Sequence, residues 1–269
     1  MTLELPCQID GVTGALIGVA TQTARAGDIV VLIVPAPGGT RTGPHRLHVR
    51  LARTLSDAGL PSLRYDPPDG GDCPPASDAA AAFDGDLVAA ARYVLGLQPG
   101  ASVAILALGE AAAAVARAWP VLAGADIALS ALCLIDPAIG GIELPPARGW
   151  WRRLFGSPSP AANGAAGGGA TNDTPRAAAV DDAYAAEAAS AWLELPQALH
   201  DTRSRLLLAT GGAEARHPAL FRLAREHRSW RKALRQPEAW LHLADADEAF
   251  GQPEHWRTLG GWLGRRIGG

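Results

Sequence analysis

The amino-acid sequence predicts an α/β fold, a mainly parallel twisted sheet with helices on both faces. Short apolar runs alternate with longer amphipathic stretches along most of the 269 residues, and this alternation is typical of a parallel sheet covered by helices. Residues 29–34 are apolar without interruption, as expected for a central strand. Hydrophobic residues make up 48% of the chain, which is enough to form one sizeable core.

The expected elements follow one another in a regular order. The predicted strands span residues 3–9, 15–20, 29–34, 61–65, 103–107, 129–135, 205–210 and 239–243, and the predicted helices span 44–58, 78–97, 110–119, 183–195, 219–234 and 255–267. Residues 156–179 are rich in Ala, Gly, Pro and Ser and cannot bury enough apolar surface to fold. We therefore expect one domain over 1–269, with an insertion at 139–200 that contains a disordered linker at 156–179.

Composition and charge exclude several classes of protein. No apolar run reaches the length of a membrane span, and the first residues carry no export signal, so we expect a cytoplasmic protein. Three widely spaced cysteines and scattered histidines lack the spacing of metal ligands, so no metal and no cofactor is expected. A net charge of −3 gives no general attraction to nucleic acid. The abundance of alanine and arginine indicates a bacterial source.

The join between the strand at 103–107 and the following helix has the build of a nucleophile elbow. In such a turn a strained backbone lifts one reactive side chain above the sheet. Small residues surround the turn here, but its central position is Gly109. Glycine has no side chain, so the turn lacks the heteroatom that covalent catalysis requires.

A resemblance to a known family covers most of the chain outside 157–195. Residues 38–66, GGTRTGPHRLHVRLARTLSDAGLPSLRYD, and the following GGD resemble the first of two hydrolase families encoded beside the exosortase A system. Residues 220–250 are similar to the end of that family, and WWRRLFG at 150–156 is similar to its lid segment. The resemblance implies an α/β-hydrolase fold with a short, partly disordered lid insertion.

The family implies a catalytic triad, and this chain departs from it at all three positions. The nucleophile position matches Gly109, the acid position matches Ala213, and the histidine position matches Glu248. Asp69 stands where the family would place a glycine. The resemblance therefore implies a degenerate member, linked to exosortase and exopolysaccharide systems.

Nearby residues offer substitutes for the missing chemistry. Glu110, Glu214 and Asp136 are the candidate acids, and Glu110 with Glu248 could form a carboxylate pair that activates water. The simpler explanation, which we favour, is that Glu110 is an acid placed at a helix N-terminus by the helix dipole. Asp136 follows the sixth strand, but no histidine is expected beside it, so it has nothing to orient. The predicted oxyanion and pocket residues are Gly38, Gly39, Thr40, Glu110 and His45.

Two functions from different classes remain open. The first is a catalytically degenerate hydrolase-like protein that binds a small acyl or lipid-linked ligand or a protein partner. The second is an active esterase or thioesterase with a relocated or water-based carboxylate site. Two basic segments could serve binding instead: the Trp- and Arg-rich stretch at 148–156, and the arginine-rich face of 219–235, although a solvated helix face is the default interpretation.

Overall fold

The computed structural model describes residues 2–12, 14–24, 27–73, 79–139, 189–236, 238–247 and 249–269. Most of the expected insertion at 139–200 lies outside the described residues. The predicted linker at 156–179 and the Trp- and Arg-rich segment also fall there. Among the described residues, no helix is long and apolar enough to cross a membrane.

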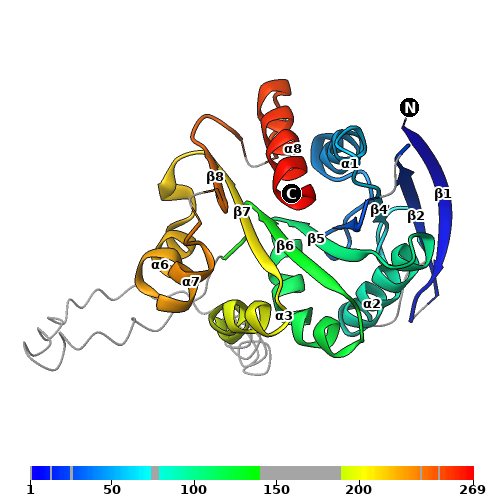
Figure 1. The fold of residues 1–269 in the computed structure, drawn as a ribbon, viewed down its shortest axis with the longest axis horizontal. Helices are drawn as coiled ribbons and strands as arrows, with labels where there is room; N and C mark the ends of the chain where they lie inside the picture. The colour runs from blue at the N-terminus through cyan, green and yellow to red at the C-terminus, as the bar shows by residue number, and fades with distance from the viewer. Residues whose placement is uncertain are drawn as a thin grey trace, which may run out of the picture.

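A mixed, mainly parallel sheet forms the centre of the fold (Figure 1). Its eight strands lie in the order β1-β2-β4-β3-β5-β6-β7-β8. β2 pairs antiparallel with β1 and β4, whereas the pairs from β4 through to β8 are parallel. The strand bounds are β1 Leu3–Asp10, β2 Ala15–Gln22, β3 Ile29–Val34, β4 Ser62–Tyr65, β5 Ser102–Leu108, β6 Leu129–Ile135, β7 Arg205–Gly211 and β8 Trp240–Leu243. The predicted fold class is confirmed.

Helices cover both faces of this sheet. Figure 1 shows α1 and α8 together on one face and α2 and α3 on the other, with α6 and α7 near the β8 edge. The bounds are α1 Leu47–Asp57, α2 Ala79–Leu97, α3 Glu110–Gly124, α6 Pro218–Glu226, α7 Arg228–Ala233 and α8 Pro253–Gly268. Residues 189–201 form a further helix, and short 3₁₀ turns span Pro44–Arg46 and Glu214–Arg216.

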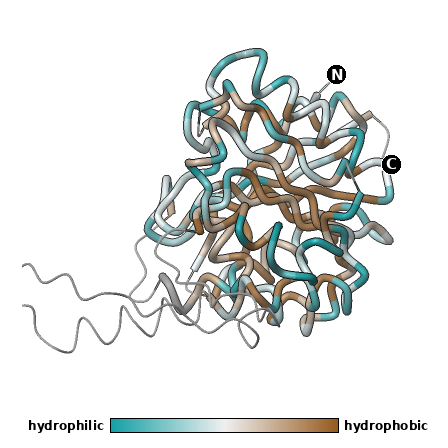
Figure 2. The backbone as a smooth tube through the Cα atoms, turned by 90° about the vertical axis from the view of Figure 1, so that its left-hand side faces the viewer, coloured by the Kyte–Doolittle hydropathy of each residue, from teal (hydrophilic) through white to brown (hydrophobic). Residues whose placement is uncertain are grey.

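The alternation of side chains along a strand divides the core into two layers. On β3, Val30, Leu32 and Val34 pack in the layer that contains α2 and α3. Val31 and Ile33 point the other way, into the layer with α1 and α8. Because successive side chains of a strand face opposite sides, an unbroken apolar run fits a strand covered on both faces. Figure 2 shows these hydrophobic segments gathered at the centre of the molecule.

Three helix predictions need correction, the first being the helix expected to end at residue 195, which continues to residue 201. The single helix expected over 219–234 is two helices, α6 and α7, because His227 has an extended backbone (φ −92°, ψ 121°). The break accompanies full burial of Trp230, whose indole N–H donates to the Trp192 carbonyl at 2.8 Å. The helix expected to end at residue 119 continues past Pro120 to Gly124. The fully buried Leu122 packs this last turn against the core.

Candidate functional site

The turn between β5 and α3 has the backbone of a nucleophile elbow. Gly109 adopts φ 59° and ψ −120°, a region that residues with side chains rarely occupy. Its N–H donates to the Ile135 carbonyl at 2.9 Å, and its own carbonyl accepts from the Ala138 N–H at 3.1 Å. Apart from its two chain neighbours, no described residue has an atom within 4 Å of a Cβ added to Gly109. The elbow backbone is therefore held in place, and no described side chain fills the position where a nucleophile would stand.

A cavity of about 1440 Å³ opens over this elbow. It lies at the carboxyl ends of the parallel strands, where ligands bind in open α/β sheets. Its walls come from the loop after β3, the elbow, the loop after β6 and the start of α6. The lining residues include Ala36, Gly39, Thr40, Gly43, His45, His48, Gly109, Glu110, Asp136, Ala138, Arg216, His217, Arg222 and Ala249.

Three side chains fix the loop after β3 against the loop after β4, and we call them the Arg41 clasp. The Asp66 carboxylate is fully buried and accepts hydrogen bonds from the Arg41 guanidinium, from the Arg41 N–H at 2.6 Å and from the Asp72 N–H at 3.1 Å. The same guanidinium contacts the Asp72 carboxylate at 2.6 Å. A charged hydrogen bond to a buried partner holds a loop more firmly than an exposed ion pair does.

Glycines bring the two loops of the clasp close together. A Cβ on Gly70 would lie 2.1 Å from the Gly39 carbonyl oxygen, and one on Gly71 would lie 2.2 Å from the Asp66 carboxylate. Asp69 has a positive φ of 62°, a conformation that glycine adopts more readily than other residues. The cleft wall on this side is thus built from tightly opposed backbone.

The predicted pocket residues lie around this wall. Gly39, Thr40, His45 and Glu110 line the cavity, whereas Gly38 occupies a turn with φ 68° and is not among the lining residues. The side chains of His45 and Glu110 are exposed. The Thr40 hydroxyl lies 2.7 Å from the Thr42 hydroxyl.

The structure places a histidine beside Asp136, so the expectation that none lies there is wrong. His217 Nε2 is 3.3 Å from Asp136 Oδ1 and 3.1 Å from the Gly211 carbonyl oxygen. The same Asp136 oxygen accepts the Gly211 N–H at 2.6 Å. The side chains of His217 and Asp136 are 10% and 4% exposed, and both residues line the cavity.

In this pair the aspartate orients the histidine as it would orient a general base. Two acceptors face Nε2, so in the neutral imidazole the proton resides on Nε2 and Nδ1 keeps its lone pair. The sequence places each residue after a strand without placing the two together: Asp136 directly follows β6, and His217 lies six residues beyond the end of β7, which the structure pairs with β6. The carboxyl ends of adjacent parallel strands lie at one edge of the sheet, so residues just after them converge.

The other candidate acids lie apart from this pair. Glu214 is an exposed residue whose carboxylate contacts the Arg225 guanidinium at 2.7 Å. Ala213 is exposed just before it. Glu110 begins α3, where an acid complements the helix dipole. Glu248 lies outside the described residues, although its neighbour Ala249 lines the cavity.

His48 is a buried polar group on the cleft wall. It begins the buried face of α1 and is 3% exposed. Burial lowers its pKa to about 4, so the ring is neutral at physiological pH. Neither ring nitrogen completes a hydrogen bond with the described residues. Its flat ring packs against Gly43, where a Cβ would approach the ring to 2.6 Å.

The described lining residues supply few nucleophiles. They include no serine and no cysteine, and Thr40 carries the one hydroxyl among them. Cys133 lies on β6 in the core, where burial raises the pKa of its thiol to about 12 and makes it unreactive. In the described part of the chain, no three His, Cys, Asp or Glu residues are grouped so that they could hold a metal ion.

The amino-acid sequence matches no protein-family model and no curated protein. Solved structures, however, resemble the fold over nearly its full length. The dienelactone hydrolase of Anabaena variabilis is 14% identical, with 98% of this chain and 96% of that chain covered and a TM-score of 0.56. An esterase of Pyrococcus furiosus is 13% identical, with 99% and 92% covered and a TM-score of 0.59.

A serine hydrolase without a lid from Xanthomonas campestris is 17% identical, with 99% of this chain and 96% of that chain covered and a TM-score of 0.55. Identities this low concern the fold alone. The strand order, the strand-to-helix turn at Gly109 and these likenesses agree with one another. The chain has the α/β-hydrolase fold.

Proposed function

We propose that the protein is a catalytically degenerate hydrolase whose cleft binds a small acyl or lipid-linked ligand without forming a covalent bond to it. The observation that carries this proposal is Gly109. It holds the backbone geometry of a nucleophile, yet it has no side chain, and no described atom stands where the reactive atom belongs. Acyl transfer through an enzyme ester requires an oxygen or sulfur at that point.

The cleft nevertheless keeps the features of a binding site. Its volume of about 1440 Å³ accommodates a ligand of substantial size. The N-terminus of α3 favours a polar group beside Gly109, and Arg222 adds a positive charge to the lining of the cavity. Apolar residues such as Leu108, Ile139 and Leu220 also line it and suit a hydrocarbon portion.

A second candidate, slow hydrolysis by an activated water, is favoured by the His217–Asp136 contact. In that reaction the water oxygen attacks the ester carbonyl while His217 Nδ1 takes the water proton. The tetrahedral intermediate then collapses, and the leaving alkoxide receives that proton as the acyl–oxygen bond breaks. A positioned base contributes about 10²–10⁴-fold to such a rate.

The setting we propose rests on the resemblance of residues 38–66 to hydrolases associated with the exosortase A system. Under this proposal the protein acts in the cytoplasm in support of exopolysaccharide production or protein sorting, as a binding or scaffolding component. Deletion of the gene in its host is expected to lower exopolysaccharide output. Complementation with the Gly109→Ala variant is expected to restore it, because that residue carries no chemistry.

A neutral monoacylglycerol, 1-octanoylglycerol, tests binding and hydrolysis together. We expect a saturable rise in Tm, corresponding to about 2.7 kcal/mol when the ligand reaches 100 times its Kd, with the ester intact by mass spectrometry after incubation. Ala138→Trp fills the cavity and should abolish the shift. Val121→Trp places the same side chain on the exposed face of α3 and should not.

The same incubation separates the two candidates. Glycerol release that disappears in His217→Gln but persists in Gly109→Ala would establish the water mechanism and overturn the non-catalytic proposal. A Tm shift that persists in Ala138→Trp would show that the ligand binds elsewhere. If the wild-type protein shows no Tm shift, the proposal that the cleft binds an acyl ligand is wrong.

A further inference from the structure

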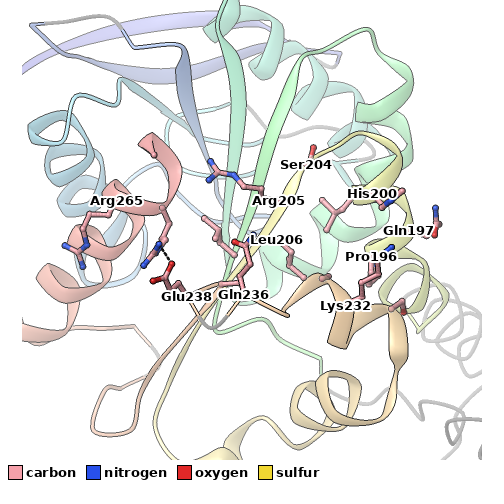
Figure 3. Close-up of a pocket in the computed structure, with 17 residues that line it drawn as sticks. Pro196, Gln197, His200, Ser204, Arg205, Leu206, Lys232, Gln236, Glu238 and Arg265 are labelled. Carbon is pink, nitrogen blue, oxygen red and sulfur yellow. Dashed lines mark hydrogen bonds and ion pairs between the residues drawn. The ribbon is translucent and has the colours of Figure 1, made fainter.

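A second hollow lies at the opposite end of the sheet from the cleft. It is a cavity of about 290 Å³ beside the first residues of β7, Arg205–Leu207. Figure 3 shows its walls, which come from the helix at 189–201, from α7 and the segment that follows it, and from α8. Because the cleft opens at the carboxyl ends of the strands, a ligand here would touch none of the residues that line the cleft.

A basic groove adjoins this cavity along α7, and we call it the α7 groove. Its four lining residues are all cations: Arg228, Arg231, Lys232 and Arg235. Lys232 also lines the cavity, so the two hollows adjoin at that residue. None of these four side chains has an ion-pair partner among the residues that the structure describes.

The spacing of these cations is unfavourable for the isolated fold. Arg228 and Lys232 are four residues apart on α7 and Arg228 and Arg231 are three apart, separations at which like charges on a helix repel. The whole chain has a net charge of −3, so general electrostatics does not explain the concentration of positive charge. An anionic ligand would relieve the repulsion between these cations, and the relief would add to the ligand's affinity.

The cavity adds further positive charge, which Glu238 and the carboxyl end of α8 at Gly269 offset in part. Arg205, Lys232, Arg265 and Arg266 line it, and Glu238 is the one acidic side chain among the lining residues. Glu238 is already engaged by the Arg266 guanidinium, as the dashed line in Figure 3 shows. Arg205 donates to the Ile267 carbonyl at 3.0 Å, which anchors the side chain without removing its charge.

The remaining lining residues indicate the size and polarity of a ligand. Hydroxyl and amide groups from Ser204, Ser229, Gln197 and Gln236 can hydrogen-bond a polar body, and Leu199, Leu206 and Ala239 provide an apolar floor. The volume is at the lower end of small-molecule sites and does not admit a folded partner. A phosphate monoester carries close to two negative charges at neutral pH, more than a single carboxylate, and so suits several uncompensated cations better.

We propose that the cavity and the α7 groove together bind a small phosphorylated molecule. Its phosphate contacts Lys232 and the arginines of the groove, and its polar body enters the cavity between β7 and α8. This site is independent of the function proposed for the cleft, and either proposal can fail without the other.

Inorganic pyrophosphate is the probe, measured by isothermal titration calorimetry with the full chain in about 50 mM salt. We expect one saturable site with a Kd of about 1 mM or tighter. The affinity should fall at least about tenfold in Lys232→Gln and in Arg231→Gln. It should also weaken as salt is raised, because exposed charges are screened. Both positions are exposed, so circular dichroism melts should match those of the wild type.

Arg222→Gln is the matched control, because it removes one positive charge from the cleft instead. Loss of pyrophosphate binding in Arg222→Gln but not in Lys232→Gln would place the anion in the cleft and overturn the proposal. So would the absence of saturable binding at about 10 mM pyrophosphate. Binding of phosphatidylserine vesicles that requires Lys232, without pyrophosphate binding, would identify a membrane-contact surface in place of a small-molecule site.

Discussion

The elbow at Gly109 lines the cleft, whereas the Arg41 clasp lies behind it and holds the loop whose Gly39 and Thr40 line it. The clasp is complete: a fully buried carboxylate is met by a guanidinium and two backbone N–H groups, and glycines bring its loops into contact. The elbow has its hydrogen bonds and its strained backbone, but no atom projects from it.

The residues that hold the shape of the cleft therefore differ from the residue at which a reactive group would stand. Burial and backbone hydrogen bonds hold the clasp, so a change there disturbs the whole wall. No described atom packs against the position of a Cβ on Gly109, so a substitution there leaves the neighbouring described atoms in place. Stability and reactivity are therefore expected to depend on different residues of one site, and each of the following predictions tests that separation.

The largest contrast is expected between two alanine substitutions at glycines. Gly70→Ala places a Cβ 2.1 Å from the Gly39 carbonyl oxygen, so we expect a loss of about 4 kcal/mol or more in the free energy of unfolding, or no folded protein. Gly109→Ala meets nothing within 4 Å and should cost only about 1–2 kcal/mol of backbone strain. Urea denaturation measures both. Equal losses would contradict the separation.

Removing the cation of the clasp should have the next largest effect. Arg41→Ala leaves the buried Asp66 carboxylate with only backbone donors, and we expect the free energy of unfolding to fall by about 3 kcal/mol. Arg53→Ala is the control, because its ion pair with Glu4 involves a side chain that is 53% exposed and should contribute less than about 1 kcal/mol. If the two variants unfold at the same urea concentration, the Arg41 clasp does not stabilise the fold more than an exposed ion pair does.

His48 should make stability depend on pH in the acid range. Its pKa is about 4 in the folded protein and near 6.5 in an unfolded chain, so below pH 6.5 the unfolded state binds the proton first. Stability is therefore lost as the pH falls from about 6.5 to 4, by about 2 kcal/mol between pH 7.5 and pH 5. In His48→Phe this loss should shrink by that amount, as measured by urea denaturation at each pH. An unchanged pH profile would show that the buried ring does not titrate as expected.

The sequence predicts the framework better than the site. Apolar runs such as 29–34 identify strands because both faces of a parallel sheet must be buried. The missing nucleophile at Gly109 is also visible, because the turn is formed from consecutive residues. The helix break at His227 is not, since it depends on how Trp230 packs against Trp192.

The His217–Asp136 contact shows why the rest of the site escapes sequence reasoning. The two residues follow neighbouring strands, but the long segment at 140–188 separates them in the chain. Only the register of β6 with β7 brings their ends together. Local patterns give the strands and their order, whereas a pair of this kind requires the paired sheet itself.

The missing side chain at Gly109 also bears on how the protein could be engineered. Two of the four glycine codons become serine codons through a single base change, and the backbone at this turn already has the conformation that a nucleophile needs. From either of those codons, one base change would place a hydroxyl in the cleft that His217 and Asp136 also line. Gly109→Ser is therefore a short first step for the directed evolution of hydrolytic activity in this cleft.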